Sequence, residues 1–201
     1  SLAANNAITA AQPTTPANYF HLLRRQALDP QHRPLVVFTP KSMLRNKRAT
    51  SEPADFTTGT FATVIGSDTT QPDDVTTLLL CSGKVYWDLV GAYEKLPAEQ
   101  AGRLAIARVE QLYPIPVAEI LAEARRYPNL REVRWVQDEP ANQGPWPTMA
   151  VQLPGYLERV APGLTLTRVS RAESPAPSVG SHAVHQQQSQ QLMAEALRTD
   201  S

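Results

Sequence analysis

The densest group of potentially reactive side chains lies between Val133 and Trp146, where the sequence reads VRWVQDEPANQGPW. The run from Val133 to Val136 predicts a buried strand, and the acids Asp138 and Glu139 predict an abrupt turn at its carboxyl end. In a layered α/β domain, ligands and partner subunits meet the sheet at this end of a strand. The adjacent acids would point apart on an extended chain, which makes them a poor acid/base pair. A capped loop with Trp146 packed over it is the alternative, and pattern alone favours the loop.

A second group is basic. Residues 24–48 contain one acid, Asp29, and seven basic side chains: Arg24, Arg25, Arg33, Lys41, Arg45, Lys47 and Arg48. The local charge of +6 is balanced by −6 after residue 48, and this asymmetry indicates an anion-binding face. A solvated rim or an arginine-rich subunit contact fits equally well. Nucleic acid is disfavoured, because the run has neither interleaved aromatic residues nor a known binding motif.

No other motif carries chemistry. The sequence CSGK at residues 81–84 lacks the upstream glycine and the following Ser/Thr of a phosphate loop, so an ordinary Ser82 helix cap is favoured. None of the histidines has metal-ligand spacing, and we interpret all as structural or surface residues: His21, His32, His182 and His185. The motifs GxSxG, HExxH, CxxC and GxGxxG do not occur. The sequence therefore predicts no catalytic residue and no metal site.

Composition predicts a soluble protein in the cytoplasm. A chain of 201 residues with 42% apolar and 19% charged residues suits one globular domain, or one domain with an arm. No run approaches the roughly 18 apolar residues that span a bilayer, and no charged residue precedes Arg24, so the basic start of a secretory signal is lacking. Because Cys81 is the only cysteine, an internal disulfide is excluded, which fits a reducing compartment. We predict that its thiol is buried and inert.

The elements that would position these groups alternate. Strands are predicted at 75–81, 104–109, 133–136 and 164–169, each followed by a helical or loop segment, and the last helix at 184–197. A weaker strand is predicted at 61–65, and 35–38 reads as a strand buried on both faces. This alternation predicts a mainly parallel sheet covered on both faces.

The first helix is predicted to begin at Thr15, as a hydroxyl cap, with Pro16 at its first position. Asp29-Pro30 would end it. Its apolar face is predicted to consist of Tyr19, Phe20, Leu23 and Ala27.

The sequence PTTPANYFHLLRRQ (residues 13–26) resembles the segment joining the last two domains of the thiamine-diphosphate-dependent E1 component of 2-oxoglutarate dehydrogenase. The match continues in order through RPLVVFTPKSMLRNK (33–47), CSGKVYWDL (81–89), AIARVEQLYPIP (105–116), WVQDEPANQGPWP (135–147) and SPAPSVGSHAVHQQQ (174–188). KSMLRNK and EPANQGPWP are most similar to the actinobacterial branch, whose enzyme is a larger multifunctional 2-oxoglutarate-metabolising protein. Six ordered matches over nearly the whole chain are far more specific than a single short motif.

The resemblance implies a three-layer αβα fold like the transketolase C-terminal domain, with a mostly parallel five-stranded sheet and one antiparallel strand. Residues 1–30 would be the tail of an upstream pyrimidine-binding domain with a linker helix, and residues 31–201 the C-terminal domain. Thiamine diphosphate, Mg²⁺ and the catalytic histidines would all belong to upstream domains. This chain would then hold no catalytic residue.

The resemblance also implies a function. The family's holoenzyme oxidatively decarboxylates 2-oxoglutarate and passes the succinyl unit to the lipoyl group of E2, a cofactor-borne chemistry. This part would build a homodimer and support the channel used by the lipoyl arm. Acetyl-CoA activates the actinobacterial branch, and its phosphates suit arginine. The implied effector contacts are Arg25 and Arg33, with Lys41, Arg45 and Lys47 as weaker additions. The implied interface residues are Asp138, Glu139, Asn142, Gln143 and Trp146.

A rival hypothesis is a free-standing domain that binds coenzyme A or a partner subunit without catalysis. The two hypotheses differ in whether the natural chain continues before Ser1, and the charge-free start favours continuation. An E1 for a related 2-oxo acid such as pyruvate is disfavoured by the tail at 174–188. Whether E2 activity is fused to the same polypeptide stays open.

Overall fold

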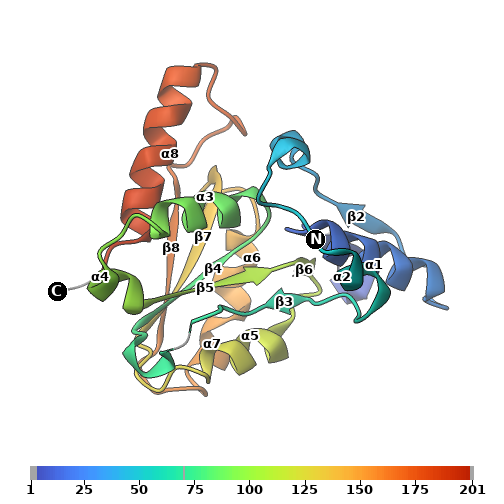
Figure 1. Ribbon diagram of the computed structural model, residues 1–201, viewed down its shortest axis with the longest axis horizontal. Coiled ribbons are helices and arrows are strands. Elements are labelled where there is room, and N and C mark those ends of the chain that lie inside the picture. The colour runs from blue at the N-terminus through green and yellow to red at the C-terminus, as the bar shows by residue number, and fades with distance from the viewer. Residues whose placement is uncertain (1–3, 70, 200–201) are drawn as a thin grey trace.

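The computed structural model describes residues 4–69 and 71–199, in which a five-stranded sheet lies between two layers of helices (Figure 1). The strand order is β3 (Val64–Ile65), β5 (Leu104–Val109), β4 (Thr77–Cys81), β7 (Glu132–Pro140) and β8 (Thr165–Arg171). All neighbouring pairs are parallel except β3 and β5. The predicted mostly parallel sheet with one antiparallel strand is therefore confirmed.

Burial of the sheet on both faces follows from alternation along its central strand. In β4, Leu78 and Leu80 belong to the core on one face, while Leu79 and Cys81 belong to the core on the other. The first face is covered by α5 (Val117–Ala124), α6 (Trp146–Gln152) and α7 (Pro154–Leu157). The second is covered by α3 (Lys84–Tyr93) and α8 (His182–Ala196). Burial raises the pKa of the Cys81 thiol well above its usual range, which agrees with an inert thiol.

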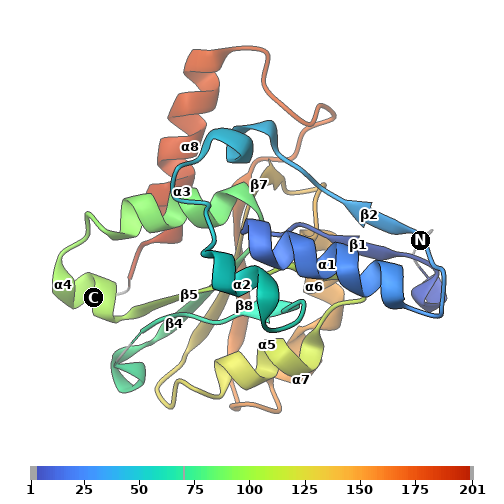
Figure 2. The same cartoon turned by 45° about the vertical axis from the view of Figure 1, so that its right-hand side comes forward.

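A smaller three-stranded sheet lies beside the main one, in the order β2 (Leu35–Val37), β1 (Thr9–Ala11) and β6 (Gln111–Tyr113). Helix α1 (Pro16–Leu28) packs here around a core of Ala11, Leu22 and Phe61 (Figure 2). Because β1 and β2 pair with each other, the predicted division at residue 30 runs between two bonded strands. The division into domains stays a prediction.

Two predictions about this region are wrong. The strand at 35–38 is not buried on both faces, because it forms the edge of the small sheet and leaves Val36 42% and Phe38 50% exposed. Helix α1 begins as predicted, with the Thr15 hydroxyl accepting from the Asn18 amide, but Phe20 and Leu23 remain 43% and 49% exposed. Its buried face is built by Leu22 instead, because the small sheet covers one side of the helix only.

Several short elements were not predicted: the helices α2 (Pro53–Thr57) and α4 (Ala98–Gly102), the 3-10 helices η1 (Ala4–Asn6), η2 (Lys41–Arg45) and η3 (Pro72–Asp74), and strand β6.

The starts of α6 and α3 depend on proline and glycine. Pro147 lies in the first turn of α6, where no backbone N–H is needed. Gly83, at φ +58°, precedes α3, and the Ser82 side chain makes no cap, contrary to prediction. No helix within the described residues is long and apolar enough to cross a membrane.

Candidate functional site

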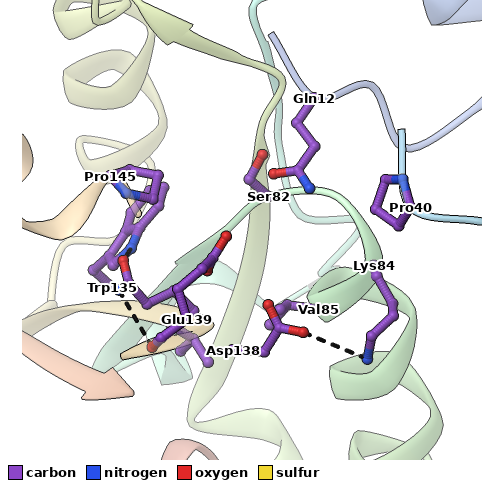
Figure 3. Close-up of a pocket in the computed structure, with 11 residues that line it drawn as sticks. Gln12, Pro40, Ser82, Lys84, Val85, Trp135, Asp138, Glu139 and Pro145 are labelled. Carbon is purple, nitrogen blue, oxygen red and sulfur yellow. Dashed lines mark hydrogen bonds and ion pairs between the residues drawn. The ribbon is translucent and has the colours of Figure 1, made fainter. Parts of the chain in front are cut away.

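The carboxyl ends of β4 and β7 form the point where chain connections diverge. From β4 the chain passes through α3 and α4 to β5, on one side of β4, whereas β7 leads through α6 and α7 to β8, on the other side. Ligands of open α/β sheets bind in the crevice at such a switch point. Here the crevice contains a small cavity of about 60 Å³, whose lining includes Ser82, Lys84, Asp138 and Glu139 (Figure 3).

Gln137, only 3% exposed, organises the chain around this cavity. Its Oε1 accepts hydrogen bonds from Trp135 Nε1 at 2.9 Å and from the Trp146 amide at 3.0 Å. Its Nε2 donates to the carbonyls of Pro140 at 3.1 Å and Gln143 at 2.8 Å. One amide side chain thus ties the end of β7 to the start of α6. In the sequence, Gln137 is marked only as an amide residue directly after the apolar run 133–136, and this pattern did not lead us to predict its role.

Gly144 completes this turn in a conformation that favours glycine. Its φ is +65°, and a Cβ atom at this position would approach the Gln137 amide to 3.2 Å. A side chain at residue 144 would therefore crowd the Gln137 amide.

The predicted turn at Asp138-Glu139 is instead the continuation of β7, which ends at Pro140. The pairing of β7 with β8 is irregular between Val136 and Pro140. The two acids do not point apart as predicted, because this irregularity lets both line the same cavity (Figure 3).

The two carboxylates have different surroundings. Asp138 Oδ2 lies 3.8 Å from Lys84 Nζ, and Lys84 also pairs with Asp88. The pKa of Glu139 is raised, first by burial and then by the negative charge of Asp138. Glu139 therefore holds its proton more tightly than an ordinary glutamate does.

The remaining predicted interface residues bind other parts of this chain. Asn142 exchanges two hydrogen bonds of 3.1 Å with the backbone of Ser174, and Gln143 Nε2 donates to the Ser174 carbonyl at 2.9 Å. The guanidinium of Arg168 lies 5.4 Å from the Trp146 ring centre. These contacts hold the loop that follows β8 against the loop that follows β7. A role of the five residues in a subunit interface stays a prediction.

Arg25 lies in a different place, at the end of α1. Its Nη2 donates to Gln111 Oε1 at 2.8 Å, and its guanidinium carbon lies 4.5 Å from the Phe61 ring centre. Partial burial of this guanidinium lowers the pKa of Arg25, against the opposing field of Asp29. A surface pocket of about 480 Å³ includes Arg24, Arg25 and Phe61 in its lining.

His21 also lines this pocket, although it is only 5% exposed. Its Nε2 lies 2.8 Å from the Asp55 carbonyl, which only accepts, so Nε2 carries the proton and donates. The other ring nitrogen, Nδ1, is buried without a partner. We predicted a structural histidine, and the packing of this ring fits that interpretation while leaving one acceptor unused.

The other predicted effector residues do not line this pocket. Arg33 Nη1 donates to the Asn6 carbonyl at 2.9 Å, which holds the segment before β2 against the amino-terminal turn. Lys41, Arg45 and Lys47 are exposed on and after η2, a turn beside the start of α1 rather than the end that carries Arg25 (Figure 2). The +6 segment is thus divided between a pocket and a separate exposed turn.

The buried carboxyl of Glu110 was not predicted from the sequence. Glu110 is fully buried between β5 and α1, and accepts from the Thr14 amide and hydroxyl at 2.7 Å each and from Asn18 Nδ2 at 3.0 Å. Burial raises the pKa of this carboxyl. Glu110 joins the start of α1 to the main sheet.

Comparison with known proteins gives consistent matches. A family model described as 2-oxoglutarate dehydrogenase C-terminal matches residues 50–197. The chain is 47% identical over 199 residues to the multifunctional 2-oxoglutarate metabolism enzyme of Mycobacterium sp. (strain KMS), covering 96% of this chain and 15% of that protein. It is 46% identical over 198 residues to the 2-oxoglutarate dehydrogenase E1/E2 component of Corynebacterium glutamicum, covering 98% of this chain and 16% of that protein.

Both relatives are several times longer than this chain, which spans 15% and 16% of their lengths. The family match begins at residue 50 and so contains the cleft at β4 and β7 but not the basic segment 24–48. The relatives extend the similarity over nearly the whole chain.

Proposed function

The chain belongs to the 2-oxoglutarate dehydrogenase C-terminal family, and from this premise we propose that it is the C-terminal dimerisation and regulatory part of a 2-oxoglutarate dehydrogenase E1. The whole protein would oxidatively decarboxylate 2-oxoglutarate and pass the succinyl unit to a lipoyl-bearing E2. The observation that carries the proposal is the family match over residues 50–197 together with the relatives' names.

The proposal assigns thiamine diphosphate and Mg²⁺ to domains outside this chain. Among residues 4–69 and 71–199, no group of three or more His, Cys, Asp or Glu side chains could hold a metal ion. When bound, the cofactor supplies the electron sink for decarboxylation. The residues of this chain would contribute a rigid sheet, a subunit contact and an effector site.

Acetyl-CoA is the effector we propose, and the pocket at the end of α1 is where we place its charged part. Arg25 is anchored there by Gln111 and Phe61, so its guanidinium loses little freedom when an anion binds. Arg24 adds a second positive charge to the same pocket, whose lining also includes one acid, Asp29. Phe61 supplies an apolar wall.

Arg33 would act from the neighbouring segment, and Lys41, Arg45 and Lys47 would contribute less. Arg33 is exposed, and among the described residues its guanidinium makes one hydrogen bond, to a carbonyl, which leaves guanidinium N–H groups available for a phosphate. The three other cations lie on or after η2, outside the pocket, and exposed charges at such separations are screened by salt.

Uncovered apolar side chains near the same face support the proposed homodimer. Phe20, Leu23 and Leu28 are 43%, 49% and 72% exposed on α1, and Val36 is 42% exposed on β2. Exposed apolar patches mark protein interaction sites. The proposed dimer would place these side chains against a second copy of the enzyme.

The test uses the full-length protein. We expect 2-oxoglutarate-dependent decarboxylation, activation by acetyl-CoA, and binding of acetyl-CoA by calorimetry. Arg25→Ala should weaken that binding by about tenfold to a hundredfold, the range for a lost hydrogen bond to a charged group, and leave the rate without effector unchanged. Arg125→Ala, an exposed arginine just after α5, is the matched control.

Two outcomes would contradict separate parts of the proposal. Full-length protein without activity on 2-oxoglutarate would reject the enzyme assignment. Activity with unchanged acetyl-CoA binding in both Arg25→Ala and Arg33→Ala would reject the effector site alone.

A further inference from the structure

The small cavity at the ends of β4 and β7 adjoins a larger one. A surface cavity of about 750 Å³ shares Gln12, Glu139 and Pro145 with it. The lining of the larger cavity is mainly apolar and includes Phe38, Leu112 and Val151, the last of which is 82% exposed. We refer to the two adjoining cavities as the cleft, with the apolar cavity as its entrance and the small acidic cavity as its inner end.

The inner end carries more negative than positive charge. Among the residues that the structure describes, Asp88, Asp138 and Glu139 interact with two cations, Lys84 and Arg171. Lys84 is already shared between Asp88 and Asp138, and Arg171 donates to the backbone carbonyls of Asp138 and Pro177. With all five groups ionised, one negative charge is left uncompensated. Burial raises the pKa of Glu139, and the neighbouring charge of Asp138 raises it further, so an added cation beside Glu139 would favour its ionised form.

An unused hydroxyl lies at the same place. Ser82 is 6% exposed and lines the small cavity, and its buried Oγ has no hydrogen-bond partner among the described residues. Buried hydroxyls without a partner are rare in native structures, so each one calls for an explanation. In Figure 3, Ser82 and Gln12 lie on one side of the cavity, and Glu139 and Asp138 on another.

Gly83 permits this arrangement. A Cβ atom at residue 83 would lie 2.4 Å from the side-chain amide of Gln12. The absence of a side chain therefore lets Gln12, from the segment after β1, reach over the start of α3 and close the cavity.

We propose that this cleft binds a primary ammonium group carried on an aliphatic stem, with the ammonium at Glu139, Asp138 and Ser82 and the stem along the apolar entrance. An ammonium has three donors, and the inner end offers two carboxylates and a hydroxyl as acceptors. A single positive charge neutralises the single excess negative charge. The inference goes beyond the proposed function, which requires neither this cleft nor such a ligand.

A metal ion fits less well. The described residues contain no group of three or more His, Cys, Asp or Glu that could hold one, and oxygen-ligated cations take six or more ligands. The apolar entrance also matches a hydrocarbon stem, which a hydrated ion lacks. Such a stem occurs on free aliphatic amines and on lysine side chains.

The test measures binding of hexylamine to the full-length protein by calorimetry, with hexanol and hexanoate as probes of equal stem length. We expect hexylamine to bind at least tenfold more tightly than hexanol, and hexanoate more weakly than both. Glu139→Gln should weaken hexylamine binding about tenfold or more, because one charge-assisted hydrogen bond is lost. Glu119→Gln, an exposed acid on α5, is the matched control and should change nothing.

Two further variants separate the site from general charge effects. Ser82→Ala keeps every charge and should weaken hexylamine binding severalfold, since an acceptor is lost. Gly83→Ala should displace Gln12 and reduce the affinity as well. Equal binding of hexylamine and hexanol, or unchanged binding in Glu139→Gln, would overturn the proposal.

The source of the ammonium is distinguished by a second probe, the tripeptide acetyl-Gly-Lys-Gly-amide. Binding comparable to that of hexylamine supports a lysine side chain of a polypeptide as the occupant. Binding of hexylamine alone supports a free amine. Binding of neither overturns the proposal.

Discussion

The acidic cleft at the ends of β4 and β7 and the basic amino-terminal face hold their charged groups in opposite ways. Around the cleft, side chains are held by other groups of the same chain: the Gln137 side chain takes part in five hydrogen bonds, the longest of them 3.5 Å, and Lys84 pairs with two acids. On the basic face, Lys41, Arg45 and Lys47 are exposed, and apolar residues of α1 lie uncovered. The side chains of the cleft are thus ordered by contacts within this chain, whereas those of the basic face are left free to contact another molecule.

Arg25 differs from the other basic residues of this face because other side chains hold it in place. Although it belongs to the basic face, it is fixed by Gln111 and by the ring of Phe61. A guanidinium held in place loses less conformational entropy on binding an anion than a free one does. Within the basic segment, the fixed arginine is therefore the better candidate for specific recognition.

The largest effect is expected inside the main sheet, at Arg134. This side chain is 5% exposed, forms two hydrogen bonds with Glu132, and donates to the carbonyls of Ala196 and Arg198 at the end of α8. Arg134→Ala would leave Glu132 without its cation and the helix end without its donors. We expect a loss of about 3–5 kcal/mol in unfolding free energy, as for other broken buried ion pairs, measured by chemical denaturation.

The pH dependence follows from the same pair. Burial alone would raise the pKa of Glu132, but hydrogen bonds from Arg134 and Thr167 outweigh it and lower the pKa. A depressed pKa contributes stability that is present above the unfolded-state value and is lost as the pH falls through the folded-state value. This acid-side loss should be absent in Arg134→Ala. Arg131→Ala, at an exposed neighbour, should leave both stability and its pH profile unchanged.

A smaller effect is expected at Glu110, which connects the start of α1 to the main sheet. Glu110→Ala leaves the Thr14 amide, the Thr14 hydroxyl and the Asn18 amide group without their acceptor. We expect a loss of about 2–3 kcal/mol and faster proteolysis within α1, because the tie that holds its start is gone. Glu173→Ala, an exposed acid, is the control. A variant with unchanged stability would show that α1 docks mainly through Leu22 and Phe61.

Glu110→Gln tests the charge separately. The pKa of Glu110 is raised by burial, so its ionisation costs the folded state stability as the pH rises from the unfolded-state pKa through the folded-state pKa. The glutamine variant should lack this decline. The unfolding free energy of the variant minus that of the natural protein should therefore increase as the pH rises from 4 towards neutral. Denaturation across that range measures this difference.

The main sheet could be predicted from sequence because each strand is an apolar run bounded by helix or loop signals. Strand β4 is the clearest case, since all five of its residues are buried. The positions of Asp138 and Glu139 at a strand end were also predictable. Their convergence on one cavity was not, because it depends on the irregular pairing between Val136 and Pro140.

The polar networks could not be predicted, because their partners lie far apart in the sequence. Glu110 and Thr14 are 96 residues apart, and nothing in the string ARVEQLY indicates which donors will surround its acid. The net charge of segment 24–48 did indicate a basic face. Its division between the pocket at Arg25 and the turn at η2 depends on the small sheet, which required the unpredicted strand β6.

A change in association rather than stability is expected on the uncovered side of α1. The double variant Phe20→Ser and Leu23→Ser removes apolar surface that is already 43% and 49% exposed. Unfolding free energy should change by less than about 1 kcal/mol, because little burial is lost. If this face forms the proposed dimer, the double variant of the full-length protein should dimerise with an affinity at least tenfold lower than that of the unchanged protein, as measured by sedimentation. Val184→Ser, at an exposed position on α8, is the control, and an intact dimer in the double variant would place the interface elsewhere.

The smallest effect is expected at the exposed turn of the basic segment. Lys41→Ala combined with Lys47→Ala removes two charges that contact neither the pocket at Arg25 nor the main sheet. Stability should stay within about 0.5 kcal/mol, as for most surface substitutions. Acetyl-CoA binding should weaken about twofold at low salt and not at all at high salt, because only a screened long-range field is lost. A loss as large as that of Arg25→Ala, and independent of salt, would mean that the turn contacts the ligand directly and that both halves of the basic segment form one site.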